Sequence, residues 1–215
     1  MSFFSYESKF SQILIKLSYS CWLNMLWIIC SLPIFTIGAS TTALYAVTLK
    51  IADDSETNVT KQFFDSFRKN FAQATRLWLI LLIAGIILGL DGYFVYHLRA
   101  SSTGAVAVMW TLNMALLIGI AIVYVIILTF TFPLLSRFDN TDIAMLKNAF
   151  LIGVRYLFLT ISVAALHFVM FYAVVVIFTP LILFGEGLVA LLSSYLMINI
   201  FRVIAYQQEN QEESE

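Results

Sequence analysis

Charged side chains are scarce in this chain. Of its 215 residues only 12% are charged, whereas 61% are hydrophobic and the mean hydropathy is +0.91. Soluble domains carry about 25% charged residues, so the chain has roughly half the charge that a water-facing surface needs. The composition therefore excludes an ordinary soluble domain.

The shortage of charge is concentrated in three stretches. Residues 17–49, 100–136 and 156–185 contain no Asp, Glu, Lys or Arg. Each stretch is longer than the ~20 residues with which a helix crosses the hydrocarbon core of a bilayer. Backbone groups in lipid must be hydrogen-bonded within the chain, which at this length only helices achieve. The sequence thus predicts an all-α, polytopic membrane protein with a single membrane-embedded domain over residues 1–206.

Histidine and cysteine are also rare, with two of each. On one helix, Cys21 and Cys30 would lie about 13 Å apart along the axis, too far for a disulfide bond. Such scattered histidines and cysteines predict no metal site. The sequence contains no phosphate-binding loop, zinc-protease motif, C-x-x-C pair or nucleophile elbow. We therefore expect no metal, no cofactor and no enzymatic activity.

Proline and glycine divide the apolar blocks. Pro33 and Gly38 interrupt the first block, and Pro180 and Gly185 interrupt the last with the same P-x4-G spacing. Both residue types break helices, so each pair predicts a turn between two helices. The predicted spans are residues 13–32, 38–52, 77–98, 104–132, 156–178 and 188–206, followed by an acidic, disordered tail over 207–215.

The distribution of basic residues favours six spans over five. With six spans and both termini in the cytoplasm, eleven of the twelve Lys and Arg residues lie inside and only Arg99 lies outside. If the first block were a single helix broken at Pro33–Gly38, Lys9 and Lys16 would move outside and the split would be nine against three. The positive-inside rule prefers six spans, with five as the alternative.

The second span is short and rich in small and hydroxyl residues. Such residues suit close contact between helices better than contact with lipid. We expect the residues around the helix break to form this contact. They are Pro33, Thr36, Gly38, Ser40 and Thr41.

Residues 60–75, between the second and third spans, form an amphipathic pattern. Aromatic residues recur on one helical face and basic residues fill the other. This pattern is typical of a helix that lies in the headgroup plane or docks into a groove of a partner protein. The sequence has no further basic patch, so no nucleic-acid partner is expected. The predicted interfacial or docking residues are Phe63, Phe67, Arg68, Lys69 and Phe71.

Ionisable residues within spans suggest a function by default. Asp91 is the only acid inside the predicted spans, and His167 lies at a similar depth on a helix that runs the same way. With three asparagines they could form a proton relay, a substrate contact or a gate, or simply hydrogen-bond neighbouring helices. The full set is Asn24, Asp91, Asn113, His167 and Asn199.

Two segments within residues 23–80 carry a family resemblance. "LNMLWIICSLPIFTIGASTTALYAVTLK" and "FFDSFRKNFAQATRLWLI" are similar to the YesL family of bacterial membrane proteins, a family of unknown function (domain of unknown function 624). The resemblance implies a location in the bacterial cytoplasmic membrane. Members of that family tend to be encoded beside components of carbohydrate ABC importers and glycan-degrading enzymes. The family offers no catalytic residues to carry over.

The resemblance implies a non-enzymatic accessory subunit of a carbohydrate or oligosaccharide ABC importer, which assists assembly, stability or coupling. Its expected partners are the lipid bilayer and ABC permease subunits, and self-association stays open. The alternative is a small autonomous transporter or channel that uses Asp91 and His167. These two hypotheses differ in whether the protein acts alone.

Overall fold

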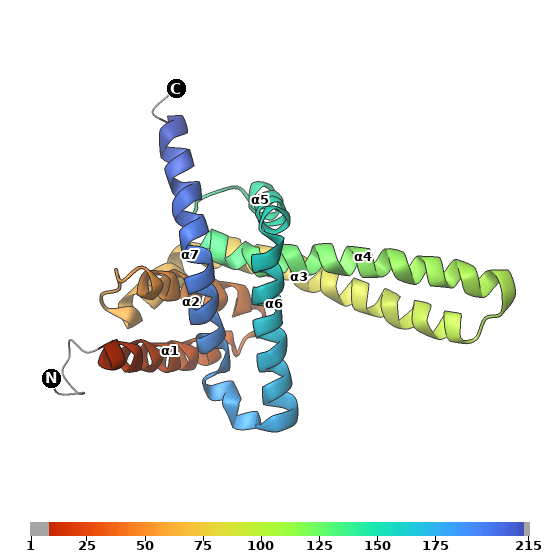
Figure 1. The fold of residues 1–215 in the computed structure, drawn as a ribbon, viewed down its shortest axis with the longest axis horizontal. Coiled ribbons are helices and arrows are strands. Elements are labelled where there is room, and N and C mark those ends of the chain that lie inside the picture. The colour runs from red at the N-terminus through yellow and green to blue at the C-terminus, as the bar shows by residue number, and fades with distance from the viewer. Residues whose placement is uncertain (1–8, 213–215) are drawn as a thin grey trace.

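The computed structural model describes residues 9–212, and over these residues the chain forms seven α-helices and no strand (Figure 1). The helices are α1 (Lys9–Ser31), α2 (Ile37–Ala52), α3 (Val59–Ala100), α4 (Gly104–Leu135), α5 (Asp142–Arg155), α6 (Leu157–Tyr172) and α7 (Gly185–Glu212). Short 3₁₀ segments η1 (Ile34–Thr36) and η3 (Thr179–Leu183) precede α2 and α7, and the π-helical turn η2 (Ala173–Ile177) follows α6.

Six segments are long and apolar enough to cross a membrane. They are Phe10–Ser31, Ile34–Ala52, Val59–Ala100, Gly104–Leu135, Leu157–Ile177 and Gly185–Gln207. The prediction of an all-α, polytopic membrane protein is therefore confirmed. The six segments are not a parallel bundle, because the α3–α4 hairpin and the α6–α7 pair run in different directions in Figure 1.

The first apolar block is a hairpin of α1 and α2. Pro33, which lacks an N–H group, begins the turn, and the Thr36 hydroxyl lies 2.6 Å from its carbonyl oxygen. Near the turn, Trp27 Nε1 donates to Thr41 Oγ1 over 3.0 Å. At the opposite end, Lys16 Nζ lies 2.5 Å from Asp54 Oδ1. Contacts at both ends show that α2 returns along α1, so the alternative of one broken span does not hold.

Helix α2 lies at the centre of the compact half of the molecule, where it packs with α1, α7 and the first part of α3. A Cβ atom at Gly38 would lie 2.5 Å from the Ala74 carbonyl oxygen and 2.6 Å from Trp78 Cβ, so α2 touches the backbone of α3. The Ser40 and Thr42 hydroxyls donate to the carbonyl groups of Thr36 and Gly38, one turn earlier, which satisfies them inside the protein. Small side chains thus allow large neighbours to pack closely around this helix. The largest fully buried neighbours include Phe63, Phe130, Phe201 and Leu23.

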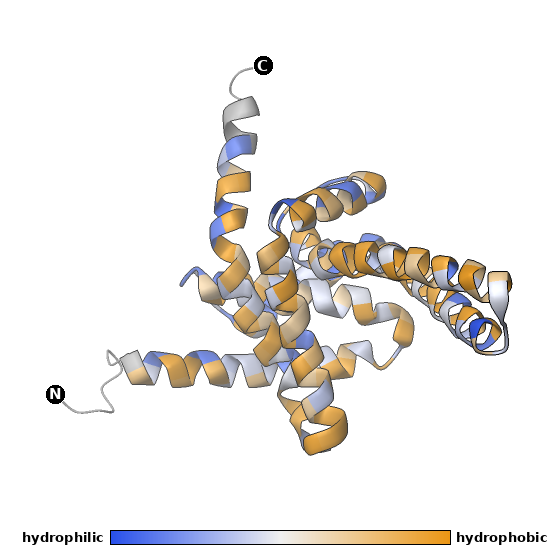
Figure 2. Cartoon of the chain, turned by 45° about the vertical axis from the view of Figure 1, so that its right-hand side comes forward, coloured by the Kyte–Doolittle hydropathy of each residue, from blue (hydrophilic) through white to orange (hydrophobic). Residues whose placement is uncertain are grey.

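The α3–α4 hairpin extends beyond this compact half as a long arm (Figure 1). Helix α3 has 42 residues, which at 1.5 Å per residue is about 63 Å. Hydrophobic residues cover most of the arm (Figure 2). Large exposed side chains on it include Ile83, Ile86, Ile87, Leu90, Leu112, Leu116 and Ile120. The arm therefore offers an apolar surface that this chain does not cover.

The amphipathic segment over 60–75 and the third predicted span form one continuous helix, because α3 continues without Pro or Gly from Val59 to Ala84. One predicted boundary is wrong. Helix α4 passes its predicted end at 132, and Pro133 lies inside it. The Ser136 N–H group still donates to the Phe132 carbonyl over 3.0 Å, so the last turn closes around the proline.

The predicted disordered tail over 207–215 is instead helical as far as Glu212, and residues 213–215 lie outside the described residues. Gln and Glu are good helix formers, and no Pro or Gly follows Gly187, so nothing ends α7 at Tyr206.

Candidate functional site

A cavity of about 290 Å³ lies where α1, α2, α3, α4, α6 and α7 come together. Its wall is mostly apolar and contains four aromatic side chains, with few polar groups. The aromatic residues are Trp27, Tyr45, Trp78 and Phe132, and the polar ones are Thr41, Thr129, His167 and Glu186. Ligand sites are typically concave, largely apolar and supplied with a few polar groups, so this cavity is the candidate site.

The two ionisable groups that meet at the cavity are His167 of α6 and Glu186 in the first turn of α7. His167 Nε2 lies 3.7 Å from Glu186 Oε1, within ion-pair distance. The other ring nitrogen, Nδ1, lies 2.9 Å from the Val163 carbonyl oxygen. A carbonyl can only accept a hydrogen bond, so Nδ1 carries a proton and Nε2 faces the carboxylate.

Asn24 holds the start of α7 against α1. Its side chain is fully buried, and its Oδ1 accepts from the Gly187 backbone N–H over 2.8 Å. Its Nδ2 donates to the Ile182 carbonyl over 3.0 Å. A Cβ atom at Gly187 would lie 2.4 Å from the Ser20 carbonyl oxygen, so only glycine allows this approach. Because Glu186 precedes Gly187, Asn24 also fixes the backbone position from which the Glu186 side chain extends.

The two tryptophans of the wall have their N–H groups already bonded. Trp27 Nε1 donates to Thr41 Oγ1, and Trp78 Nε1 donates to the Ile34 carbonyl over 2.8 Å. An indole ring has only this one donor. Trp27 and Trp78 therefore contribute ring surface to the cavity and no free hydrogen-bond donor.

The structure gathers only part of the predicted intramembrane polar set. Asn24 and His167 lie at or beside the cavity. Asp91 on α3 and Asn113 on α4 are exposed, and neither forms a hydrogen bond or ion pair with another described residue. Asn199 on α7 is exposed and accepts from Arg202 over 3.5 Å. The predicted pairing of Asp91 with His167 is wrong, because the helices turn Asp91 outward.

Sequence reasoning missed Glu186, the acid that does meet His167. The residue fell in the segment predicted to be a turn between two spans and was not counted as intramembrane. One signal was present: Glu186 is the only acid between Asp142 and Glu209, and it directly follows an uncharged stretch of 30 residues, 156–185. An isolated acid beside apolar helices is expected to have a partner.

The predicted helix-break residues lie on both sides of the turn. Thr36, Gly38 and Ser40 are buried, Thr41 lines the cavity, and Pro33 is exposed at the turn. The Thr36 hydroxyl also lies 2.6 Å from the Cys30 carbonyl, which ties the end of α1 to η1. Residues near the break thus shape one wall of the cavity.

The predicted docking residues divide between the core and the surface. Phe63 is fully buried among apolar residues of α1, α2 and α7, so its assignment to a docking face is wrong. The apolar face of α3 is used by the core of this chain, and Phe67 is half-buried there. Arg68 and Lys69 are exposed, Phe71 is 37% exposed, and Lys69 Nζ lies 3.1 Å from Asp139 Oδ2.

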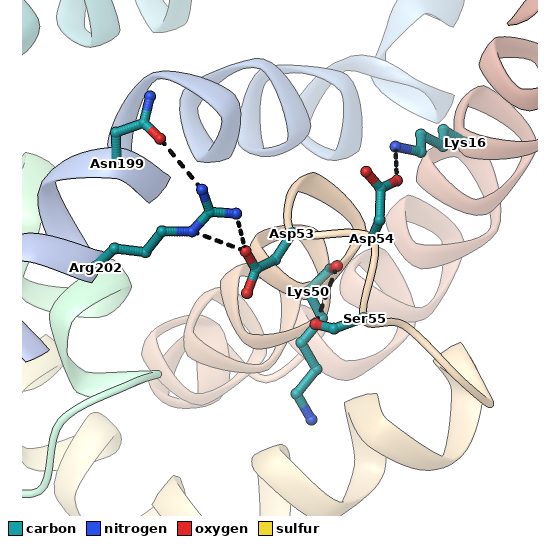
Figure 3. Close-up of polar contacts among 7 residues, drawn as sticks. All are labelled: Lys16, Lys50, Asp53, Asp54, Ser55, Asn199 and Arg202. Atoms are coloured by element: carbon teal, nitrogen blue, oxygen red, sulfur yellow. Dashed lines mark hydrogen bonds and ion pairs between the residues drawn. The ribbon is translucent and has the colours of Figure 1, made fainter.

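Charged residues that follow α2 link it to α1 and α7 (Figure 3), at the end of α2 opposite the α1–α2 turn. Asp54 accepts from Lys16 of α1, and Asp53 accepts from the Arg202 guanidinium of α7. In Figure 3 the two aspartates point to different sides, each toward its own basic partner, whereas the Lys50 amine points away from both. These ion pairs bring the first half of α1 and the second half of α7 to the same end.

Comparisons with known proteins agree on one family. The family model described as "Protein of unknown function, DUF624" matches residues 21–92. "Uncharacterized protein YteU" of Bacillus subtilis (strain 168) is 27% identical over 168 residues, which cover 76% of this chain and 71% of that protein. "Uncharacterized protein YesL" of the same organism is 26% identical over 213 residues, covering 95% and 93%. No solved structure matches the chain significantly. The chain therefore contains a segment similar to the DUF624 family, and it is similar to YesL over most of its length.

Proposed function

We propose that the protein is a non-enzymatic membrane subunit that acts beside a carbohydrate or oligosaccharide ABC importer. It would assist the assembly, stability or coupling of the importer. The YesL-like resemblance implies this role, and both termini are then cytoplasmic by the positive-inside rule.

The observation that carries the proposal is an exposed strip on the first half of α3. Lys61, Arg68 and Phe71 are exposed there, and the side chains of Lys61 and Arg68 form no hydrogen bond or ion pair with other described residues. Arg68 and Phe71 are three residues apart and share one helical face. Exposed aromatic and arginine side chains are the residue types enriched at the centres of protein interfaces. The strip therefore suits a partner protein at the cytoplasmic side of the membrane.

Co-purification from the native host tests this proposal. Tagged protein would be extracted in mild detergent from cells grown on several glycans, and its partners would be identified by mass spectrometry. We expect stoichiometric ABC permease subunits with the wild type and at least a tenfold loss with Arg68→Glu/Phe71→Asp. Lys147→Glu is the matched control, because it reverses an exposed, unpaired cation on α5 and should retain the partner. Recovery of the wild type without any importer subunit would contradict the proposal.

A second candidate function is an autonomous small transporter, favoured by the ion pair of His167 and Glu186 at the cavity. Glu186 replaces Asp91 in this role, because Asp91 does not reach His167. The purified protein alone would then move a solute in liposomes, and Glu186→Gln would abolish transport while Asp91→Asn would not. Equal transport by both variants would contradict this role.

A further inference from the structure

We propose that the cavity binds a small organic cation and releases one proton as the cation enters. The binding site consists of the Glu186 carboxylate, the His167 imidazole and the aromatic wall formed by Trp27, Tyr45, Trp78 and Phe132. This inference goes beyond the role beside an importer and does not depend on it.

The first step concerns the proton between His167 and Glu186. Because His167 Nδ1–H donates to the Val163 carbonyl, a neutral imidazole would turn the lone pair of Nε2 toward the carboxylate 3.7 Å away. Two acceptors facing each other repel, whereas a proton on Nε2 makes an imidazolium–carboxylate pair. In the free cavity the pair is therefore neutral overall and holds one exchangeable proton.

The other elements around the cavity contribute no further charge. Tyr45 of α2 is the one additional titratable side chain among the lining residues, and it is neutral at physiological pH. The lining residues from α1, α3 and α4 are Trp27, Trp78, Val125, Leu128, Thr129, Phe132 and Pro133, none of which titrates. Glu186 is thus the only group in the wall that can carry a negative charge at neutral pH.

The aromatic wall identifies the chemical class of the ligand. Faces of Trp, Tyr and Phe rings attract organic cations, and aromatic cages are the usual recognition site for quaternary ammonium groups. A sugar would instead need several free hydrogen-bond donors, but the N–H groups of Trp27 and Trp78 are already used. The volume of about 290 Å³ lies at the small end of ligand pockets, so it suits a compact ammonium ion.

Charge balance then requires an exchange. A bound cation beside Glu186 and a protonated His167 would leave one uncompensated positive charge in an apolar site, which costs several kcal/mol. Loss of the Nε2 proton restores neutrality: the cation pairs with the Glu186 carboxylate, His167 becomes neutral, and one proton leaves to solvent. Charge and protons balance, and no other reactant is needed.

Binding of choline to the purified full-length protein in detergent tests the proposal. Its uncharged isostere, 3,3-dimethylbutan-1-ol, is the matched ligand control. We expect choline to quench tryptophan fluorescence and to release one proton in weakly buffered solution. While the free pair is protonated, choline should bind about tenfold more tightly for each unit by which the pH rises. The alcohol should bind at least tenfold more weakly. Equal binding of alcohol and choline, or choline binding without proton release, would overturn the proposal.

Variants separate the two ionisable roles. Glu186→Gln should lose choline binding, whereas His167→Gln should bind choline without releasing a proton. Asp91→Asn, an exposed acid outside the cavity, should match the wild type. If Glu186→Gln does not fold, the proton release and the charge preference of the wild type decide the question. Failure of choline, tetramethylammonium and tetraethylammonium to bind the folded wild type would also overturn the proposal.

Discussion

Helices α2 and α4 are both apolar enough to span a membrane, yet they have opposite environments. In the most apolar window of α2, 67% of the residues are buried inside the protein, against 22% in α4. Helix α2 is built from small and hydroxyl residues, whereas the outer part of α4 carries large aliphatic side chains. Apolarity thus marks a helix as a span, and side-chain size decides whether it lies at the centre or faces lipid.

The largest expected effect comes from adding one methyl group to α2, which is compared with adding one to α4. Gly38→Ala on α2 would bring Cβ within 2.9 Å of three neighbouring atoms, including the Ala74 carbonyl oxygen, so helices α2 and α3 must move apart. We expect a loss of about 3 kcal/mol in the free energy of unfolding, measured by denaturant titration in detergent.

Gly119→Ala on α4 is the matched control, because nothing lies within 4 Å of its Cβ position. It should be neutral, or should raise stability by up to about 1 kcal/mol through higher helix propensity. Equal destabilisation by both variants would show that the proposed contrast between buried α2 and exposed α4 is wrong.

The second effect contrasts two asparagines. Asn24→Ala leaves the Gly187 N–H and the Ile182 carbonyl without their partner inside the protein, and should cost about 2 kcal/mol. Asn113→Ala, on the exposed surface of α4, should be neutral. Thermal unfolding followed by circular dichroism compares the two variants. An unfolding temperature of Asn24→Ala equal to that of the wild type would contradict the role of Asn24 in holding the start of α7.

A smaller effect is expected at the end of the molecule where Arg202 meets Asp53. Both side chains are partly exposed, and exposed ion pairs contribute only about 0.2–1 kcal/mol. A double-mutant cycle with Arg202→Ala and Asp53→Ala should give a coupling energy in that range that falls with added salt. A coupling energy several times larger would mean that this end, and not α2, holds the compact half together.

The smallest effect is a pH dependence at the start of α5. The Arg76 guanidinium donates to the Asp142 carboxylate over 2.9 Å and holds the pKa of Asp142 below its ordinary value of 3.8. Because the pKa of Asp142 is lower in the folded state, its ionised carboxylate stabilises the protein above pH 3.8. This stabilisation is lost as the pH falls through the pKa of the folded state.

The stability difference between wild type and Arg76→Gln, measured by thermal unfolding, should therefore shrink as the pH falls from about 6 to below 3. Lys147→Gln, which removes an unpaired cation on the same short helix, should show no such change. A difference that persists undiminished at the lowest pH would exclude the ion pair as its cause.

The fold was largely predictable because uncharged stretches and helix-breaking residues can be read directly along the sequence. Runs without charge located the spans, and Pro33 located the turn of the first hairpin. Hydropathy marks the part of α3 that can cross the membrane and not the end of the helix, because the polarity changes near Arg76 while the backbone continues. The sequence pattern therefore located membrane crossings better than helix ends.

The candidate site was predictable only in part. Spacing gives the depth of a residue along a helix, and this placed Asn24 and His167 correctly as interior polar groups. It does not give the rotation of one helix against another, which turns Asp91 and Asn113 outward. Rotation is set by contacts such as Gly187 against the Ser20 carbonyl, which pair residues distant in sequence.

Photo-crosslinking in living cells tests the proposed importer role most directly, and it compares the exposed strip of α3 with the apolar arm. The photoreactive residue p-benzoylphenylalanine would replace Phe71 on the exposed strip of α3 in one variant and Leu116 on the arm in another. We predict that Phe71→p-benzoylphenylalanine captures a subunit of a carbohydrate ABC importer, whereas Leu116→p-benzoylphenylalanine captures lipid. Capture of lipid alone, or of a second copy of this chain, at position 71 would contradict the importer role.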